Sequence, residues 1–124
     1  MTVVLDSSAL LALIFGERGA GRVASVVNGA IVPAPQWAEV LQKVAFLGRD
    51  PDVVGAEVLG FDVHVEMVDQ QDAERAAALW APSTSLSLAD RFCLAVAERM
   101  GARCVTADRM WAKAKTTAKV ALVG

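Results

Sequence analysis

Short apolar runs alternate along the chain with longer segments in which apolar side chains recur at helical spacing. The first run, residues 3–5, is continuously apolar, which is typical of a strand buried on both faces. The pattern predicts strands at residues 3–5, 31–32, 61–68, 103–106 and 120–123. It predicts helices at residues 9–15, 19–27, 36–47, 51–59, 70–80, 88–100 and 109–114. Because the two kinds of element alternate, we expect an α/β fold: a three-layer α/β/α sandwich with a central parallel sheet.

Two of the predicted strands carry further information. Pro33 and Pro35 keep the second strand short, because proline cannot donate a hydrogen bond to a sheet. In residues 61–68 apolar and polar side chains alternate, with Phe61 and Met67 at the two ends of the apolar side. This alternation predicts a strand with one face in water, close to an edge of the sheet.

Composition limits the class of protein. A chain of 124 residues is expected to form one domain, residues 1–124, and 55% apolar residues exclude a disordered chain. The net charge of −2 does not indicate a nucleic-acid binder. Residues 108–119 differ, because they hold one acid and four bases, a local balance of +3: Arg109, Lys113, Lys115 and Lys119. This segment is either a patch that approaches phosphate or a solvated helix face.

The cysteines and the N-terminal residues indicate the compartment. Cys93 and Cys104 lie in apolar surroundings without a metal-type spacing, so we expect buried free thiols. The first residues lack the basic start of a signal peptide. The apolar stretch at residues 9–15 is much shorter than the ~20 residues of a membrane span. The sequence therefore predicts a cytoplasmic protein without membrane attachment.

Acidic residues stand at positions where a folded protein needs a reason for them. Asp6 and Asp108 each follow a predicted strand, and Asp90 lies beside apolar positions on a predicted helix. Because the carboxyl ends of parallel strands meet at one edge of a sheet, acids placed there can converge. Clustered carboxylates repel one another unless a cation neutralises them, and hard oxygen ligands suit Mg²⁺ or Mn²⁺. A metal-dependent phosphoryl-transfer site is the first hypothesis.

Each acid also has a simpler interpretation. Asp6 and Asp108 can cap the helices that follow them, and Ser87 with Asp90 matches a capping box. Glu39 faces away from the apolar stripe of its helix, so the pattern alone predicts an exposed glutamate. The single histidine, His64, excludes a histidine-rich metal site and a histidine-based catalytic triad.

Four segments together resemble a known family. They are Val4–Leu10 (VLDSSAL), Ala38–Leu41 (AEVL), Leu86–Arg91 (LSLADR) and Thr106–Trp111 (TADRMW). In this order and spacing they resemble PIN-domain ribonucleases, in particular the VapC toxins of bacterial toxin–antitoxin systems, along nearly the whole chain. The chain departs from that group at Pro33–Trp37, where a serine-led segment usually leads into the helix that carries Glu39.

The resemblance implies the fold, the activity and the partners. The first strand should be central in the sheet, and the protein should be an endoribonuclease that uses Mg²⁺ or Mn²⁺. Asp6, Glu39, Asp90 and Asp108 should form its acidic pocket. The expected partners are an RNA substrate, a second copy of the chain in a homodimer, and a small antitoxin whose C-terminal segment covers the pocket.

The predicted site assigns a role to each residue. Asp6 and Asp90 hold one divalent ion, and Asp108 and Glu39 complete or orient its surroundings, partly through water. The hydroxyls of Ser7 and Thr106 hold the carboxylates in place. Two further residues, Arg91 and Arg109, either contact the RNA backbone or are ordinary surface charges. The alternative is a non-catalytic module of the same fold that binds RNA or protein, in which the acids are only helix caps.

Overall fold

The strands of the computed structural model, which describes residues 2–124, form one parallel sheet. The strand order is β3-β2-β1-β4-β5, and every neighbouring pair is parallel. The strands are β1 (Val3–Leu5), β2 (Ile31–Pro33), β3 (His64–Glu66), β4 (Arg103–Thr106) and β5 (Val120–Leu122). The first strand is central, as the resemblance predicts.

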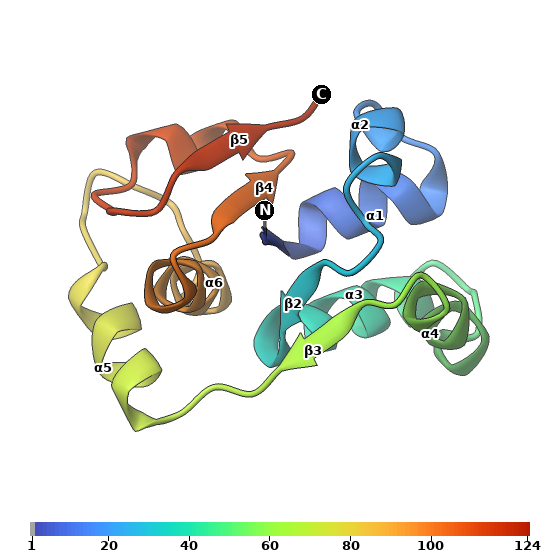
Figure 1. Cartoon of the computed structure of the whole chain (residues 1–124), viewed down its shortest axis with the longest axis horizontal. Coiled ribbons are helices and arrows are strands. Elements are labelled where there is room, and N and C mark those ends of the chain that lie inside the picture. The colour runs from blue at the N-terminus through green and yellow to red at the C-terminus, as the bar shows by residue number, and fades with distance from the viewer. Residues whose placement is uncertain (1) are drawn as a thin grey trace.

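Helices cover both faces of this sheet (Figure 1). They are α1 (Ser7–Phe15), α2 (Ala20–Ala24), α3 (Ala34–Phe46), α4 (Pro51–Leu59), α5 (Gln70–Ala78), α6 (Leu88–Met100) and the 3₁₀ helix η1 (Arg109–Lys113). Helices α1 to α4 pack on one face, and the end of α5, α6 and η1 pack on the other. The predicted α/β/α sandwich is therefore confirmed.

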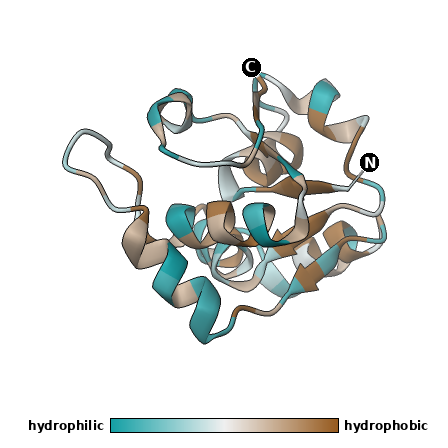
Figure 2. Cartoon of the chain, turned by 60° about the vertical axis from the view of Figure 1, so that its left-hand side comes forward, coloured by the Kyte–Doolittle hydropathy of each residue, from teal (hydrophilic) through white to brown (hydrophobic). Residues whose placement is uncertain are grey.

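Alternation along the strands produces the two cores. In β1, Leu5 packs with α1–α4, whereas Val4 packs against α6 and Trp111 on the opposite face. Neighbouring residues of β4 divide in the same way, because successive side chains of a strand point to opposite faces. Figure 2 shows the apolar residues concentrated on the strands between the helical layers. None of the helices in residues 2–124 has the length and apolar content of a membrane span.

The predicted cysteine state is confirmed. Cys93 of α6 and Cys104 of β4 are free, buried thiols whose Sγ atoms lie 3.7 Å apart. Burial raises the pKa of the Cys93 thiol, with the neighbouring Cys104 as a further cause. A thiol held protonated in apolar surroundings is unreactive, so the pair belongs to the packing between α6 and the sheet.

Two predicted strands differ from the observed ones. The strand predicted at residues 61–68 shrinks to β3, although it does lie at an edge of the sheet. Val63 is buried in the core, but Phe61 is 45% exposed and Met67 is 82% exposed, so only the middle of the predicted apolar side is covered. Asp62 adopts a positive φ of 61°, which places the residues before β3 in a turn. Strand β2 ends at Pro33, which keeps it short as expected.

Charged side chains of α6 fix its surroundings. Arg99 donates hydrogen bonds to both carboxylate oxygens of Asp72, at 2.9 and 3.0 Å, and thereby joins α6 to α5. Glu98 accepts from Arg75 at 2.6 Å and from the hydroxyl of Thr116, which precedes β5, at 2.5 Å. Because α6 carries Asp90 at its first turn, these contacts also fix the position of that acid.

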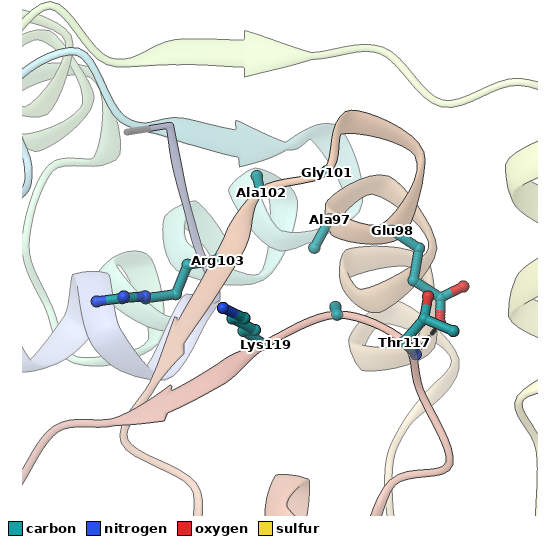
Figure 3. A pocket seen from close by; sticks show the side chains of 8 residues that line it. Ala97, Glu98, Gly101, Ala102, Arg103, Thr117 and Lys119 are labelled. Carbon is teal, nitrogen blue, oxygen red and sulfur yellow. Dashed lines mark hydrogen bonds between the residues drawn. The ribbon is translucent and has the colours of Figure 1, made fainter.

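The basic run of residues 108–119 does not form a single face. Arg109 lies beside the residues that end β5, at the carboxyl edge of the sheet. Lys119 lies beside Arg103, where β4 and β5 begin, at the opposite edge (Figure 3). Arg109 follows β4 and Lys119 precedes β5, so the two parallel strands place them at opposite ends of the sheet. A count of charges along the sequence does not show this separation.

Candidate active site

Asp6 is the most deeply buried acid at the carboxyl edge of the sheet. It follows β1, and its main-chain N–H donates to the carbonyl of Val105 in the neighbouring β4. The side chain is 1% exposed and caps α1 by accepting from the N–H of Ala9 at 2.8 Å. Hydroxyls complete its surroundings: Ser8 lies 2.8 and 2.9 Å from the two carboxylate oxygens, and Thr106 donates to Oδ2 at 2.5 Å.

The environment of Asp6 disfavours its charge. Burial is the largest effect and raises the pKa of Asp6 to about 7. The hydrogen bonds from Thr106, Ala9 and Ser8 lower this pKa, and the negative charge of Asp90 raises it. An acid that three donors cannot keep ionised at its ordinary pKa gains stability from a nearby positive charge.

Glu39 and Asp90 belong to the same electrostatic cluster. Glu39 of α3 is half-buried and accepts from the hydroxyl of Ser7 at 3.2 Å, and burial followed by the charge of Asp90 raises its pKa. Asp90, at the first turn of α6, forms the predicted capping box with Ser87, at 3.1 Å for each hydrogen bond. The charge of Asp90 also raises the pKa of both Asp6 and Glu39, so this residue acts on the cluster in addition to capping α6.

The pattern-based prediction that Glu39 is an exposed helical residue is wrong. The first turn of α1 packs against α3, and the main-chain N–H of Ser7 donates to Oε1 of Gln36, at 2.5 Å. Gln36 is 0% exposed, and within residues 2–124 its Nε2 has no hydrogen-bond partner. Sequence reasoning missed Gln36, although it stands one helical turn before Glu39 on the same helix.

Asp108 is connected to Asp6 through Thr106. The main-chain N–H of Asp108 donates to the hydroxyl of Thr106 at 3.0 Å, and that hydroxyl donates to Asp6. The carboxylate of Asp108 accepts from the N–H of Met110 at 2.9 Å and so caps η1. The hydroxyls of Ser7 and Thr106 thus each donate to a carboxylate of the cluster, as the sequence predicts.

The two predicted RNA-contacting arginines lie in different surroundings. Arg91 donates to the carbonyl of Ala76 at 2.9 Å, which directs its guanidinium towards α5 and not along the strand ends. Arg109 is exposed at the carboxyl edge, directly after Asp108. Arg109 is thus the more exposed of the two, and the contact of both with RNA stays a prediction.

A comparison of the sequence with known families decides the family. The family model of the PIN domain matches residues 3–116. The chain belongs to the PIN-domain family. No curated protein matches the sequence significantly.

Solved structures of similar fold include toxins and toxin–antitoxin complexes. A toxin–antitoxin complex from Klebsiella pneumoniae is 22% identical, with a TM-score of 0.71, over 89% of this chain and 90% of that chain. VapC20 from Mycobacterium tuberculosis, described as a sarcin–ricin loop cleaving toxin, is 17% identical, with a TM-score of 0.74, over 93% and 96% of the two chains. VapBC2 from Rickettsia felis, bound to promoter DNA, is 9% identical, with a TM-score of 0.78, over the full length of both chains. At these identities the similarity establishes the PIN fold.

The donor set of this PIN domain fits a hard divalent cation that binds few protein ligands. Within residues 2–124, no three acidic, histidine or cysteine side chains are placed to hold a metal ion together. The ligand set of Asp6, Asp90 and Asp108 therefore stays a prediction, and the carboxylate of Asp108 caps η1. Mg²⁺ commonly takes only one or two protein carboxylates and keeps several waters. An ion shared by Asp6 and Asp90 meets this requirement and offsets their mutual repulsion.

Proposed function

We propose that this PIN-domain protein is an endoribonuclease that depends on Mg²⁺ or Mn²⁺, and that it is the toxin of a VapBC-type toxin–antitoxin pair. The observation that carries the proposal is the carboxylate cluster at the carboxyl edge of the sheet. A buried Asp6 with a pKa of about 7 interacts there with Asp90, which also raises the pKa of Glu39. Carboxylates that destabilise one another in this way suit a cation and the phosphodiester that it attracts.

Asp6 and Asp90 are the residues that would hold the ion. When bound, the ion supplies Lewis-acid polarisation of a phosphate oxygen and a water of lowered pKa. The hydroxyls of Ser8 and Thr106 fix both oxygens of Asp6, so the carboxylate does not reorganise when substrate binds.

On this proposal, Glu39 accepts the proton of the attacking water. Its Oε1 is held by the hydroxyl of Ser7, and its raised pKa brings it closer to neutral pH, where a general base works best. Asp108 follows β4 at the same edge and adds negative charge beside the cluster. In-line attack of water on the phosphorus would leave a 5′-phosphate and a 3′-hydroxyl.

The toxin assignment adds a protein partner. Its support is the set of PIN-fold neighbours, which include complexes named as toxin–antitoxin pairs from Klebsiella pneumoniae and Rickettsia felis. On this proposal a small antitoxin covers the acidic cluster, the chain forms a homodimer, and the protein acts in the cytoplasm.

A second candidate function is a non-catalytic binding module. It is favoured by the capping hydrogen bonds, because Asp6, Asp90 and Asp108 all cap a helix. Burial of Asp6 argues for the nuclease: an exposed aspartate caps a helix equally well, for about 1 kcal/mol, without a raised pKa. Glu39 caps nothing, yet α3 places it in the same cluster.

Incubation of the purified protein with a mixture of cellular RNAs tests the nuclease. We expect cleavage with Mg²⁺ or Mn²⁺ and none in EDTA, because the carboxylates alone provide no electrophile. The downstream RNA products should carry a 5′-phosphate, so a ligation reaction that requires this group should join them to an adapter. Mn²⁺ should also raise the melting temperature by a few degrees, since a ligand that binds the folded state stabilises it. Undiminished cleavage in EDTA would contradict the metal-dependent mechanism, and the absence of cleavage under all conditions would favour the binding module.

A further inference from the structure

Three arginines from three different segments line a groove at the carboxyl edge of the sheet. Arg18 comes from the loop between α1 and α2, Arg22 from α2, and Arg109 from η1. The groove has two adjoining parts that share Arg18 and Gly124, one containing Arg109 and the other Arg22. All three arginine side chains are exposed. The fold thus gathers basic residues that are far apart in the sequence.

Close backbone packing builds this groove beside the acidic cluster. Val123 donates from its N–H to the carbonyl of Thr106 at 2.8 Å, which places the residues after β5 next to the donor that holds Asp6. Gly19 packs against Gly124, and a Cβ at Gly19 would lie 2.9 Å from the main-chain nitrogen of Gly124. Figure 1 shows the last described residues beside α2. The α1–α2 loop is therefore fixed against the end of β5, on the Asp108 side of the cluster.

The charge of the groove is not neutralised within the protein. The ion pairs found in residues 2–124 involve Arg75, Arg99 and His64 as the basic partners, and none of the three groove arginines. Glu17, next to Arg18, is exposed and forms no ion pair with it within the same residues. The chain as a whole carries a net charge of −2, so this groove is a local exception.

The lining of the groove suits a phosphodiester backbone. Guanidinium groups bind phosphate with two parallel hydrogen bonds, and Gly21 of the lining has open space where a side chain would lie. No aromatic side chain is among the lining residues of either part, so the groove offers contacts to a phosphate backbone and not to stacked bases. Three arginines without an acidic partner favour a polyanionic ligand.

We infer that Arg18, Arg22 and Arg109 bind consecutive phosphates of a single-stranded RNA and lead it to the acidic cluster. The inference rests on the proposed function for the nature of the ligand, but it concerns binding and not cleavage. Ala107 lies in the groove between Thr106 and Asp108 in the sequence, so the two sites are contiguous. The acids repel RNA, and the arginines provide the attraction that the net charge does not.

The opposite edge of the sheet offers a matched control. Arg103 begins β4 and Lys119 directly precedes the neighbouring β5, beside a pocket formed by α6 and the residues before β5 (Figure 3). They carry two positive charges, as Arg18 and Arg22 do, and are far from the carboxyl edge along the strands. Their removal changes the net charge equally and leaves the groove intact.

The experiment measures binding of a fluorescein-labelled single-stranded RNA of about ten nucleotides by anisotropy, in EDTA, over a series of salt concentrations. The proteins are the wild type, Arg18→Gln/Arg22→Gln and Arg103→Gln/Lys119→Gln. We expect the groove variant to bind roughly tenfold more weakly at low salt. The slope of log K against log salt should become shallower by about 1.4, because the variant neutralises two fewer phosphates. The control variant should bind as the wild type does.

The inference would be overturned by equal weakening in both double variants, by unchanged binding in the groove variant, or by no binding of RNA to the wild type. Displacement of RNA by an acidic peptide of equal charge and at equal concentration would assign the groove to a protein partner and also overturn it. A parallel cleavage assay separates the two proposals. If RNA binding depends on Arg18 and Arg22 but no metal-dependent cleavage occurs, the nuclease is rejected and the groove is retained. If the protein cleaves RNA but the groove variant binds RNA normally, the groove is rejected and the nuclease is retained.

Discussion

Replacement of Asp6 by asparagine should lower the rate of metal-dependent RNA cleavage about a thousandfold or more. Asparagine caps a helix as well as aspartate does, so the hydrogen bond from the N–H of Ala9 and the start of α1 should survive. The substitution removes the negative charge that the cation needs. Replacement of Asp90 by asparagine should have a similar effect, because Asp90 acts on both Asp6 and Glu39. The measurement is the initial rate of cleavage of a substrate RNA in Mg²⁺.

The control for this loss is Asp50→Asn. Asp50 caps α4 by accepting from the N–H of Asp52 at 2.9 Å, and it is exposed. It shares the capping role of Asp6 but is exposed and lies outside the carboxylate cluster. Cleavage by Asp50→Asn should equal that of the wild type. Wild-type rates in both Asp6→Asn and Asp90→Asn would show that the cluster is not the active site.

The second large effect concerns stability without metal. In EDTA, the free energy of unfolding of the wild type should fall relative to that of Asp6→Asn as the pH rises from about 4 to about 7. The pKa of Asp6 is raised from 3.8 to about 7, so between these values the folded state holds a proton that the unfolded state has released. The proton on Asp6 therefore stabilises the folded state fully below pH 3.8, and this stabilisation is lost as the pH rises to about 7. Above that pH the difference in stability between the two proteins no longer changes. The expected change in the difference is about 3 kcal/mol.

The comparison with Asp6→Asn isolates the effect of this one group. Asp72 and Glu98 have lowered pKa values, and they contribute stability that is lost as the pH falls through their folded values. Both proteins contain these residues, so their contributions cancel in the difference. Urea unfolding curves at several pH values provide the measurement. A difference that does not change with pH would mean that Asp6 is ionised normally and that burial does not disfavour its charge.

The sequence predicted the fold through its periodicity. Helices are predicted because apolar side chains repeat every 3.6 residues, and strands because short apolar runs lie between the helices. Both patterns reflect the packing that forms the two cores. The strand predicted at residues 61–68 is too long, because Phe61 and Met67 satisfy the alternation but are exposed, whereas Val63 between them is buried. Alternation shows which side chains share a face and does not show that a second layer covers that face.

The candidate site was predictable where it follows from a strand end. Asp6 and Asp108 stand directly after strands, so the parallel sheet brings them to one edge. Glu39 did not follow from pattern, because its position depends on how α3 packs against α1, through Ser7 and Gln36. The resemblance to the PIN family identified it.

Long-range assembly also explains the features that sequence reasoning did not predict. The count of bases in residues 108–119 suggested one patch, yet Arg109 lies beside the end of β5 and Lys119 lies at its start. The groove instead combines Arg109 with Arg18, which is 91 positions earlier in the chain and carries no local signal. Such combinations arise from contacts between the end of β5 and the α1–α2 loop.

The central claim is that acids remote in the chain share one divalent cation at the carboxyl edge of the sheet. The most direct measurement is the anomalous scattering of crystals grown with Mn²⁺. We predict one strong peak about 2.1 Å from an oxygen of Asp6 and an oxygen of Asp90, with water in the remaining positions. Crystals of a cleavage-competent protein in which Mn²⁺ is bound elsewhere, with Asp6 and Asp90 outside its coordination sphere, would contradict the account.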